Sequence, residues 1–148
     1  MNRPVLVFAI GFASCAYGQV QIQPLQEKDV DFGCGCSFRL PGATPELSNI
    51  ILMWEEGGPA KMRINGRLET LTVSKPKIYY KLEDFEKVGD RTVYKLTSSR
   101  WSATVDCQAT KVCSRDDDSC ESTSYMATLF LTSPKAKESF KLQGSCGC

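Results

Sequence analysis

The sequence predicts an all-β fold, a small antiparallel meander of about eight strands that closes, or nearly closes, into a disulfide-stapled barrel. Three observations predict it. Apolar residues recur at every second position, no long helical segment separates the short strands, and a Cys-Gly-Cys motif lies at each end of the domain. A barrel is favoured because closure removes exposed strand edges, and a β-sandwich is the alternative.

Residues 1–18 have the layout of a signal peptide. Arg3 is their only charge, and the apolar run of residues 5–13 is much shorter than the ~20 residues of a membrane-spanning helix. Two processing routes are open. Cleavage after Gly18 leaves a mature chain of residues 19–148. Lipoprotein-type cleavage before Cys15 makes Cys15 an acylated first residue, because the four residues ending there are similar to a bacterial lipobox.

The mature chain, residues 19–148, is expected to be a single exported β domain. The whole chain has 18 basic and 17 acidic residues; without Arg3 the balance is 17 against 17, a net charge of zero. A neutral chain without a basic run argues against nucleic acid and against electrostatic membrane attachment. We expect a periplasmic protein or an outer-membrane lipoprotein held by Cys15, with secretion as the alternative.

Strands are predicted wherever apolar and polar residues alternate. In chain order they are residues 19–23, 32–38, 50–54, a hairpin around Asn65 and Gly66, and residues 78–82, 92–96, 101–107, 125–131 and 140–142. A helical turn or two is predicted over residues 83–88, ended by Gly89.

The hairpin around Asn65 and Gly66 is the clearest local signal. A two-residue turn is the usual form for Asn-Gly. We favour instead a three-residue loop with a left-handed glycine, because it pairs Met62 with Leu68 and Lys61 with Glu69, apolar with apolar and basic with acidic.

Without Cys15, seven cysteines remain, and disulfides are expected in an exported chain. They fall into three groups: Cys34 and Cys36; Cys107, Cys113 and Cys120; Cys146 and Cys148. Bridges between the two Cys-Gly-Cys motifs are favoured, because a strand places both cysteines of a motif on one face, whereas a bridge within a motif closes too small a ring. One pair of the middle group is expected to bridge and the third thiol to stay free.

Two functional alternatives compete with the staple. Four thiolates from the two motifs would suit a tetrahedral copper or zinc site, and a single Cys-x-Cys pair would suit redox exchange. The structural role is favoured because exported chains oxidise their thiols, so no metal and no cofactor is predicted.

Catalysis is not predicted. The chain has no histidine, which removes the usual general base and most nucleophile pairs, and it has no Gly-x-Ser-x-Gly motif. A hydrolase with two carboxylates is the remaining enzyme alternative. The adjacent Glu55 and Glu56 lie in a glycine-rich loop and are expected to be solvated, so no catalytic residue is assigned.

Two clusters of aromatic and charged residues are candidates for binding a protein partner, because tryptophan and arginine dominate binding hot spots. The candidates are Trp54, Glu55 and Glu56 in one cluster and Ser99, Arg100 and Trp101 in the other. The alternative is that both tryptophans are core residues, as their strand parity suggests.

The segment of residues 58–71 and the segment Ser98 to Trp101 resemble the bacterial envelope lysozyme inhibitors, which include membrane-bound inhibitors of c-type lysozyme and periplasmic immunity lipoproteins. The resemblance covers about half of the chain. It implies an antiparallel β domain that blocks a lysozyme-like peptidoglycan hydrolase by inserting a loop into its cleft. Ser99 stands where that family has glycine, and the Cys-Gly-Cys motifs lie outside its pattern.

Overall fold

The computed structural model describes residues 18–31, 33–80, 86–114, 116–117 and 119–148. Within them lie ten strands and two short 3-10 helices, Glu27–Asp29 and Leu47–Asn49. The strands are β1 (Ile22–Gln23), β2 (Gly35–Arg39), β3 (Ile50–Glu55), β4 (Ala60–Ile64), β5 (Arg67–Val73), β6 (Lys77–Ile78), β7 (Arg91–Thr97), β8 (Ser102–Lys111), β9 (Ser122–Ser133) and β10 (Ala136–Gly147).

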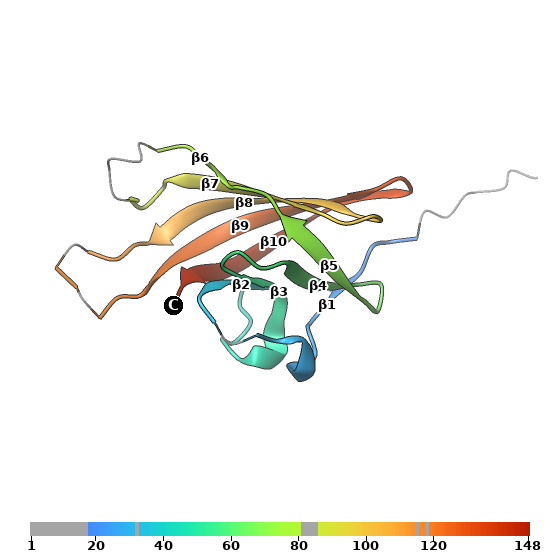
Figure 1. Ribbon diagram of the computed structural model, residues 1–148, viewed down its shortest axis with the longest axis horizontal. Helices are drawn as coiled ribbons and strands as arrows, with labels where there is room; N and C mark the ends of the chain where they lie inside the picture. The colour runs from blue at the N-terminus through green and yellow to red at the C-terminus, as the bar shows by residue number, and fades with distance from the viewer. Residues whose placement is uncertain (1–17, 32, 81–85, 115, 118) are drawn as a thin grey trace, which may run out of the picture.

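Eight of the strands form a closed antiparallel barrel, as predicted (Figure 1). Its order follows the chain from β2 through β3, β4, β5, β7, β8 and β9 to β10, and β10 then pairs with β2. Each strand of the barrel has a hydrogen-bonded neighbour on both sides. Closure therefore pairs the edges that an open sheet of these strands would expose.

The short strands β1 and β6 complete two seams of the barrel. β4 pairs with β3 through residues 60–62 and with β1 through residues 63–64. In the same way β7 pairs with β5 through residues 96–97 and with β6 through residues 92–93. Each short strand thus continues a ladder where a barrel strand ends, which satisfies backbone groups that would otherwise lack a partner.

The interior of the barrel is filled by apolar side chains at alternate strand positions, as the period of two predicts. The largest of those fully buried in the main cluster are Phe38, Ile51, Leu52, Met62, Ile64, Leu71, Leu96, Val105, Leu129, Leu131 and Leu142. Trp54 is also buried in this cluster, and Trp101 is half-buried against it.

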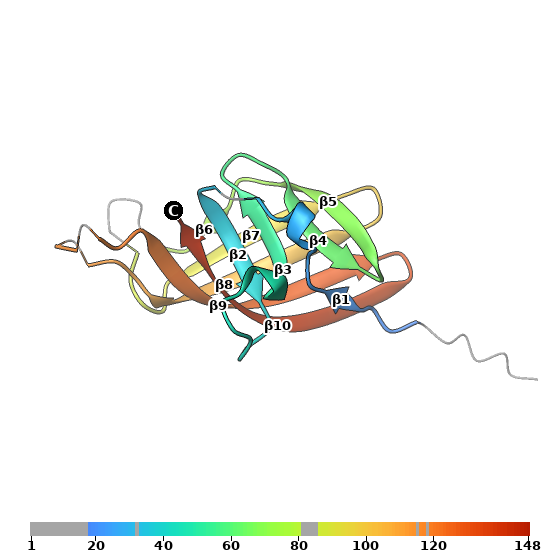
Figure 2. The same cartoon turned by 90° about the horizontal axis from the view of Figure 1, so that it is seen from below.

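A smaller apolar cluster lies on the outside of the barrel. Met53 packs there against Leu25 and Val30 from the segment that carries the first 3-10 helix. The backbone N–H of Leu25 donates to the carbonyl of Ile50 at 2.7 Å, which fixes the segment to β3. Figure 2 shows this segment crossing the outer face of β3 and β4.

The predicted three-residue loop between β4 and β5 is wrong. Met62 lies opposite Glu69, so Asn65 and Gly66 form a two-residue turn. Both turn residues have positive φ, 50° and 79°, as the usual Asn-Gly turn requires. Leu68 consequently faces outward and stays 37 % exposed.

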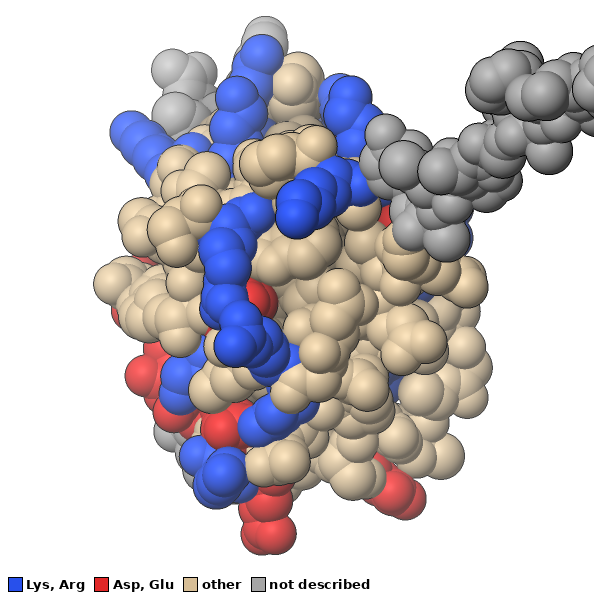
Figure 3. All heavy atoms as spheres, turned by 90° about the vertical axis from the view of Figure 1, so that its right-hand side faces the viewer, with Lys and Arg blue, Asp and Glu red and all other residues tan. Residues whose placement is uncertain are grey.

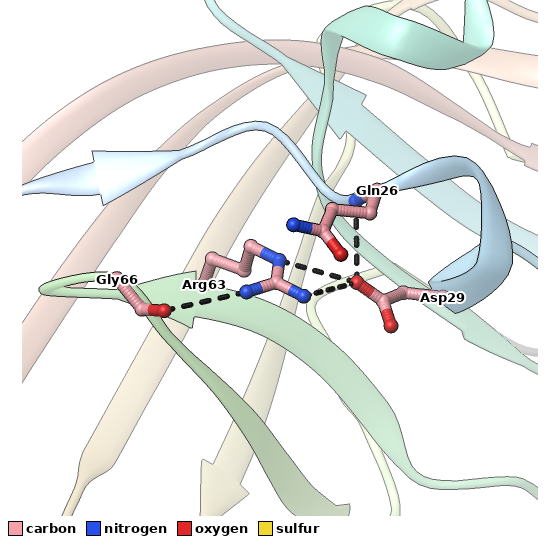
Figure 4. A network of polar contacts seen from close by, with 4 residues as sticks. All are labelled: Gln26, Asp29, Arg63 and Gly66. Carbon is pink, nitrogen blue, oxygen red and sulfur yellow. Dashed lines mark hydrogen bonds and ion pairs between the residues drawn. The ribbon is translucent and has the colours of Figure 1, made fainter.

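In this register, charged residues of the hairpin pair with residues that lie far away in the sequence. Arg63 binds Asp29, with Nε and Nη2 at 3.1 and 2.7 Å from the same carboxylate oxygen, and it also donates to the carbonyl of Gly66 (Figure 4). Glu69 pairs with Arg100 at 2.8 Å. Lys61 pairs with Asp31 at 2.7 Å, so the Lys61–Glu69 pair on which the predicted register depended does not form.

Some predicted elements are shorter than expected. Of the predicted strand 19–23, only residues 22–23 form a ladder. Near the predicted strand 78–82 only residues 77–78 do so, and Tyr80 lies in a bend. Leu82 and residues 83–85 of the predicted helical turn lie outside the described residues, and Glu86 to Val88 are not helical. Residues 1–17, with Cys15, also lie outside them. No helix in the described part of the chain is long and apolar enough to cross a membrane.

Candidate functional site

The barrel has two different ends. We call one the disulfide end; it carries Cys34, Cys148, the β3–β4 loop and residues 74–76. We call the other the hairpin end; it carries the tight turns between β4 and β5, β7 and β8, and β9 and β10. In Figure 1 the disulfide end lies to the left, near the C-terminus, and the hairpin end to the right.

Two disulfides join β2 to β10 at the disulfide end. Cys36 lies directly opposite Cys146 in the ladder and is bonded to it. Cys34 is bonded to Cys148 just beyond the paired residues. The sequence separations are 110 and 114 residues, so both bridges close almost the same loop. The prediction that the two Cys-Gly-Cys motifs bridge each other across the closing seam is confirmed.

The glycines within these motifs allow neighbouring strands to approach closely. A Cβ atom on Gly35 would overlap the carbonyl oxygen of Trp54 in β3, and one on Gly147 would overlap the carbonyl oxygen of Glu121. A larger residue at either position would push the adjacent chain segment away. Each Cys-Gly-Cys motif therefore has two roles: its cysteines bridge β2 to β10, and its glycine allows close approach of the chain segment on the other side, β3 beside Gly35 and Glu121 beside Gly147.

Cys113 and Cys120, in the predicted middle group, form the third disulfide, within the β8–β9 connection. Cys107, which the sequence placed in the same group, is the free thiol and is buried in the barrel. Burial, with smaller contributions from the charges of Asp106 and Glu86, raises the pKa of Cys107 to about 12. The thiol therefore stays protonated and unreactive near neutral pH.

A hollow of about 490 Å³ opens at the disulfide end. The two seam disulfides form one wall of it, and Trp54, Val73 and Tyr94 contribute apolar surface. The Trp54 ring stacks on Phe38 with centroids 5.7 Å apart and meets Tyr94 at 5.0 Å, so packing fixes the indole. Burial raises the pKa of Tyr94 to about 12, which keeps the phenol neutral. The hollow can accept an apolar or aromatic group of a partner.

An acidic loop, residues 55–59, borders this hollow. The backbone N–H of Glu56 donates to the carbonyl of Cys34 at 2.8 Å, and that of Gly58 donates to the carbonyl of Glu55 at 3.0 Å. Glu56 is exposed and Glu55 is half-buried. Within the described residues neither carboxylate belongs to an ion pair. The loop is thus fixed to the disulfide seam while its two carboxylates stay available.

The second predicted binding cluster is held down at the hairpin end. Ser98 Oγ accepts hydrogen bonds from the backbone N–H groups of Arg100 and Trp101, which shapes the β7–β8 turn. Arg100 reaches across to Glu69, whose carboxylate is 4 % exposed. Trp101 covers part of the core, and Ser99 is exposed. This guanidinium already has a carboxylate partner within the chain.

The six candidate binding residues therefore form two groups at opposite ends of the barrel. Trp54, Glu55 and Glu56 lie at the disulfide end, and Ser99, Arg100 and Trp101 lie at the hairpin end. Val73 and Tyr94 were missed as companions of Trp54. The alternation of residues predicted an inward Tyr94, but no local sequence signal brings it beside a tryptophan forty residues earlier.

The described residues contain no group of three or more Cys, Asp or Glu side chains placed to hold a metal ion. The four cysteines of the alternative copper or zinc site are joined in two disulfides, so they offer no thiolate in this state.

Comparison with protein-family models, with curated proteins and with solved structures found no match to the chain. Function is therefore inferred from the two barrel ends themselves.

Proposed function

We propose that the protein is an exported binding protein of the cell envelope that captures a lysozyme-like peptidoglycan hydrolase and has no catalytic activity of its own. The observation that carries the proposal is the acidic loop at the disulfide end: Glu56 lines an apolar hollow, Glu55 lies next to it in the chain with its side chain against Gly33, and within the described residues neither carboxylate belongs to an ion pair. An apolar recess rimmed by available charges is a typical composition for a protein-binding surface.

The loop is prepared for binding before any partner arrives. The hydrogen bond from Glu56 to Cys34 ties it to a residue that is itself bonded to Cys148. A loop fixed in this way loses little conformational entropy when it docks, so more of its contact energy appears as affinity. This argument supports insertion of the β3–β4 loop into the cleft of a partner.

Charge supports the same choice. Two carboxylates on one loop attract a basic hydrolase surface and accelerate its association. Arg100, the alternative contact for a hydrolase's catalytic carboxylates, is already bound to Glu69. Using it would require the buried Glu69 to give up its partner, which is costly. We therefore assign the contact to Glu55 and Glu56.

Export and the envelope location rest on the cysteines. Three disulfides in a domain of this size are typical of oxidising compartments. They support the proposals of a signal peptide over residues 1–18 and of a periplasmic location. Acylation of Cys15 would then hold the protein at the outer membrane. The absence of histidine from the sequence supports binding rather than catalysis.

The test is titration of the exported, purified protein with a basic c-type lysozyme and a bacterial lysozyme-like hydrolase, together with the rate at which each clears a peptidoglycan suspension. We expect binding and slower clearing. Neutralising the loop with Glu55→Gln and Glu56→Gln should weaken binding by about tenfold or more.

The matched control neutralises Glu46 and Glu138, two exposed acids away from the disulfide end, and should change the affinity less than about twofold. The proposal is wrong if the unmodified protein binds neither enzyme, or if the control pair weakens binding as much as the loop pair does.

A further inference from the structure

The N-terminal segment joins the barrel at the hairpin end. Val20 is 3 % exposed and packs into the main core, and Ile22 pairs with Ile64 at the tip of β4. Gly18, the first described residue, shares a shallow hollow with Lys135 and Lys137 of the β9–β10 hairpin. Whatever precedes Gly18 is therefore attached to the domain at this end, as Figure 1 shows for the start of the chain.

The same end carries a concentration of basic side chains. The hairpin-end cations, as we call them, come from three separate turns and are Arg67, Arg100, Lys135 and Lys137, all of them exposed. Figure 3 views the molecule from this side, and Lys and Arg form a band across the face, with the acidic groups mostly toward its lower margin. The residues lie up to seventy positions apart, so the sequence showed no basic run, and the neutral net charge concealed this local excess.

Most of this positive charge has no ion-pair partner among the residues that the structure describes. Arg100 is bound to Glu69, but within the described residues Arg67, Lys135 and Lys137 belong to no ion pair. Glu138 is the exposed acid next to them. Lys135 and Lys137 line the hollow beside Gly18, but Arg67 lies on a different turn outside it, so the three free cations do not converge on one pocket. Such an arrangement suits an extended negative surface better than one small anion.

We infer that the hairpin end is a docking surface for anionic phospholipid headgroups. Basic residues close to a membrane are attracted by its negative surface potential, and the attraction reaches about one Debye length. The attachment point of the N-terminal segment supports this partner. If Cys15 is acylated, only two residues lie between it and Gly18, and the three steps of chain span at most about 11 Å. The hairpin-end cations then lie at headgroup height.

This orientation leaves the disulfide end pointing away from the bilayer. The acidic loop and its hollow lie at the opposite end of the barrel, so they stay open to a soluble partner while the cations contact lipid (Figure 1). Lipid docking does not depend on the identity of that partner. It can therefore be tested without any hydrolase present.

The test compares partitioning of the exported, purified protein onto phosphatidylcholine vesicles with and without phosphatidylglycerol. The quantity measured is the ratio of the two partition coefficients at low ionic strength. A lipid on Cys15 would contribute to both vesicle types and cancels in this ratio. Each basic residue near an anionic surface is worth about fivefold, so replacing Arg67, Lys135 and Lys137 by Gln should lower the ratio by about a hundredfold.

The matched control replaces Lys75, Lys87 and Lys111, three exposed lysines toward the disulfide end, by Gln. It makes the same change in net charge and should lower the ratio less than about threefold. High salt should abolish the preference of the unmodified protein for anionic vesicles. Equal melting temperatures for both triple variants verify that folding is intact. If a triple variant fails to fold, Lys135→Gln alone should still lower the ratio of partition coefficients by about fivefold.

Three outcomes would overturn the inference. The first is a ratio of partition coefficients near one for the unmodified protein, and the second is an equal fall of that ratio in the two triple variants. The third is a hairpin-end triple variant that loses affinity for a soluble polyanion such as heparin but keeps the vesicle ratio of the unmodified protein. The last outcome would make an anionic polymer the partner instead of a membrane.

Discussion

The two ends of the barrel are stabilised by different means. At the hairpin end the interior is filled, with Val20 and the half-buried Trp101 packed on the core and Glu69 bound to Arg100. At the disulfide end a hollow of about 490 Å³ remains, and covalent bonds hold the closing strands together.

The difference shows how an end of a small barrel can stay open. An empty space deprives its lining of van der Waals contacts, so an open end contributes less packing energy than a filled one. A covalent bridge between β2 and β10 compensates by restricting the unfolded chain rather than by adding contacts. The disulfide end can therefore present a hollow to a partner without weakening the seam beside it.

The largest effect is expected from removing both seam disulfides. Replacing Cys34, Cys36, Cys146 and Cys148 by Ala should lower the free energy of unfolding by about 4–5 kcal/mol, the value of one closed loop of this length. Removing Cys34 and Cys148 alone should cost about 1 kcal/mol, because the remaining bridge closes nearly the same loop. Urea unfolding of the three proteins measures both differences. If the four-cysteine variant lost only about twice as much as the Cys34–Cys148 variant, the bridges would contribute independently, which would contradict the shared loop.

A smaller effect is expected from the Cys113–Cys120 bridge. Its loop of seven residues restricts the unfolded chain less, so Cys113→Ala with Cys120→Ala should cost about 2 kcal/mol. The seam and the hollow should be unaffected, since this bridge lies within the β8–β9 connection. Loss of hydrolase binding in this variant would contradict the separation of the two regions.

At the hairpin end the ion pair is the element to break. Arg100→Ala leaves the buried Glu69 carboxylate without its partner and should cost about 1–2 kcal/mol, a range reduced because the arginine is half exposed. Adding Glu69→Gln removes the unpaired charge and should restore part of the loss. Urea unfolding of both single variants and the double variant gives the coupling energy. A double variant less stable than Arg100→Ala would contradict a direct pairing.

Acid should weaken the attachment of the N-terminal segment. The side-chain hydrogen bonds from Arg63 lower the pKa of Asp29 in the folded protein, although burial opposes them. The unfolded chain therefore takes up the proton first as the pH falls, so this carboxylate's contribution to stability is present above about pH 4 and lost below it. Asp29→Asn should flatten the dependence of unfolding free energy on pH between about pH 5 and about pH 3. If the unfolding free energies of the unmodified protein and of Asp29→Asn change with pH in parallel, this role of Asp29 is excluded.

The last prediction concerns Cys107, the buried free thiol of the described residues, and leaves stability near neutral pH unchanged. With a pKa of about 12, Cys107 should react with iodoacetamide at about pH 8 at least a hundredfold more slowly in the folded protein than in the unfolded one. The unfolded thiol ionises near about pH 8.5, whereas the folded thiol stays protonated up to about pH 12. Raising the pH therefore favours the unfolded chain, and the free energy of unfolding should fall between about pH 9 and about pH 12. Mass spectrometry before and after unfolding measures the reaction. Rapid native alkylation would mean that β8 opens locally.

Local patterns predicted most of the barrel. Alternation placed Ala103, Val105 and Cys107 inside β8, and the paired motifs indicated which strands close the barrel. The turn at Asn65 and Gly66 was predicted wrongly because a pairing of Lys61 with Glu69 was given more weight than the usual Asn-Gly turn. In the folded chain Lys61 pairs with Asp31 and Glu69 with Arg100, which are distant in the sequence. Periodicity identifies the face of a strand and carries no information about its distant charge partners.

The candidate site was less predictable than the fold. Trp54, Glu55 and Glu56 were identified because they are adjacent in the sequence. The hollow beside them needs Val73 and Tyr94, and the hairpin-end cations come from three turns, so both are products of topology. Residues gathered by closure of a barrel leave no mark in a single sequence, because their spacing depends on every strand between them.

The Cys34–Cys148 bridge also determines how a pulling force would travel through the molecule. A force applied between Gly18 and Cys148 passes along residues 18–34 and then across the disulfide, so residues 35–147 form a covalently closed ring that carries no tension along its backbone. A single proteolytic cut in any loop of that ring would likewise leave its two pieces covalently joined. A protein tethered at one terminus and engaged by a partner at the other end could thus be strained without its barrel being unravelled.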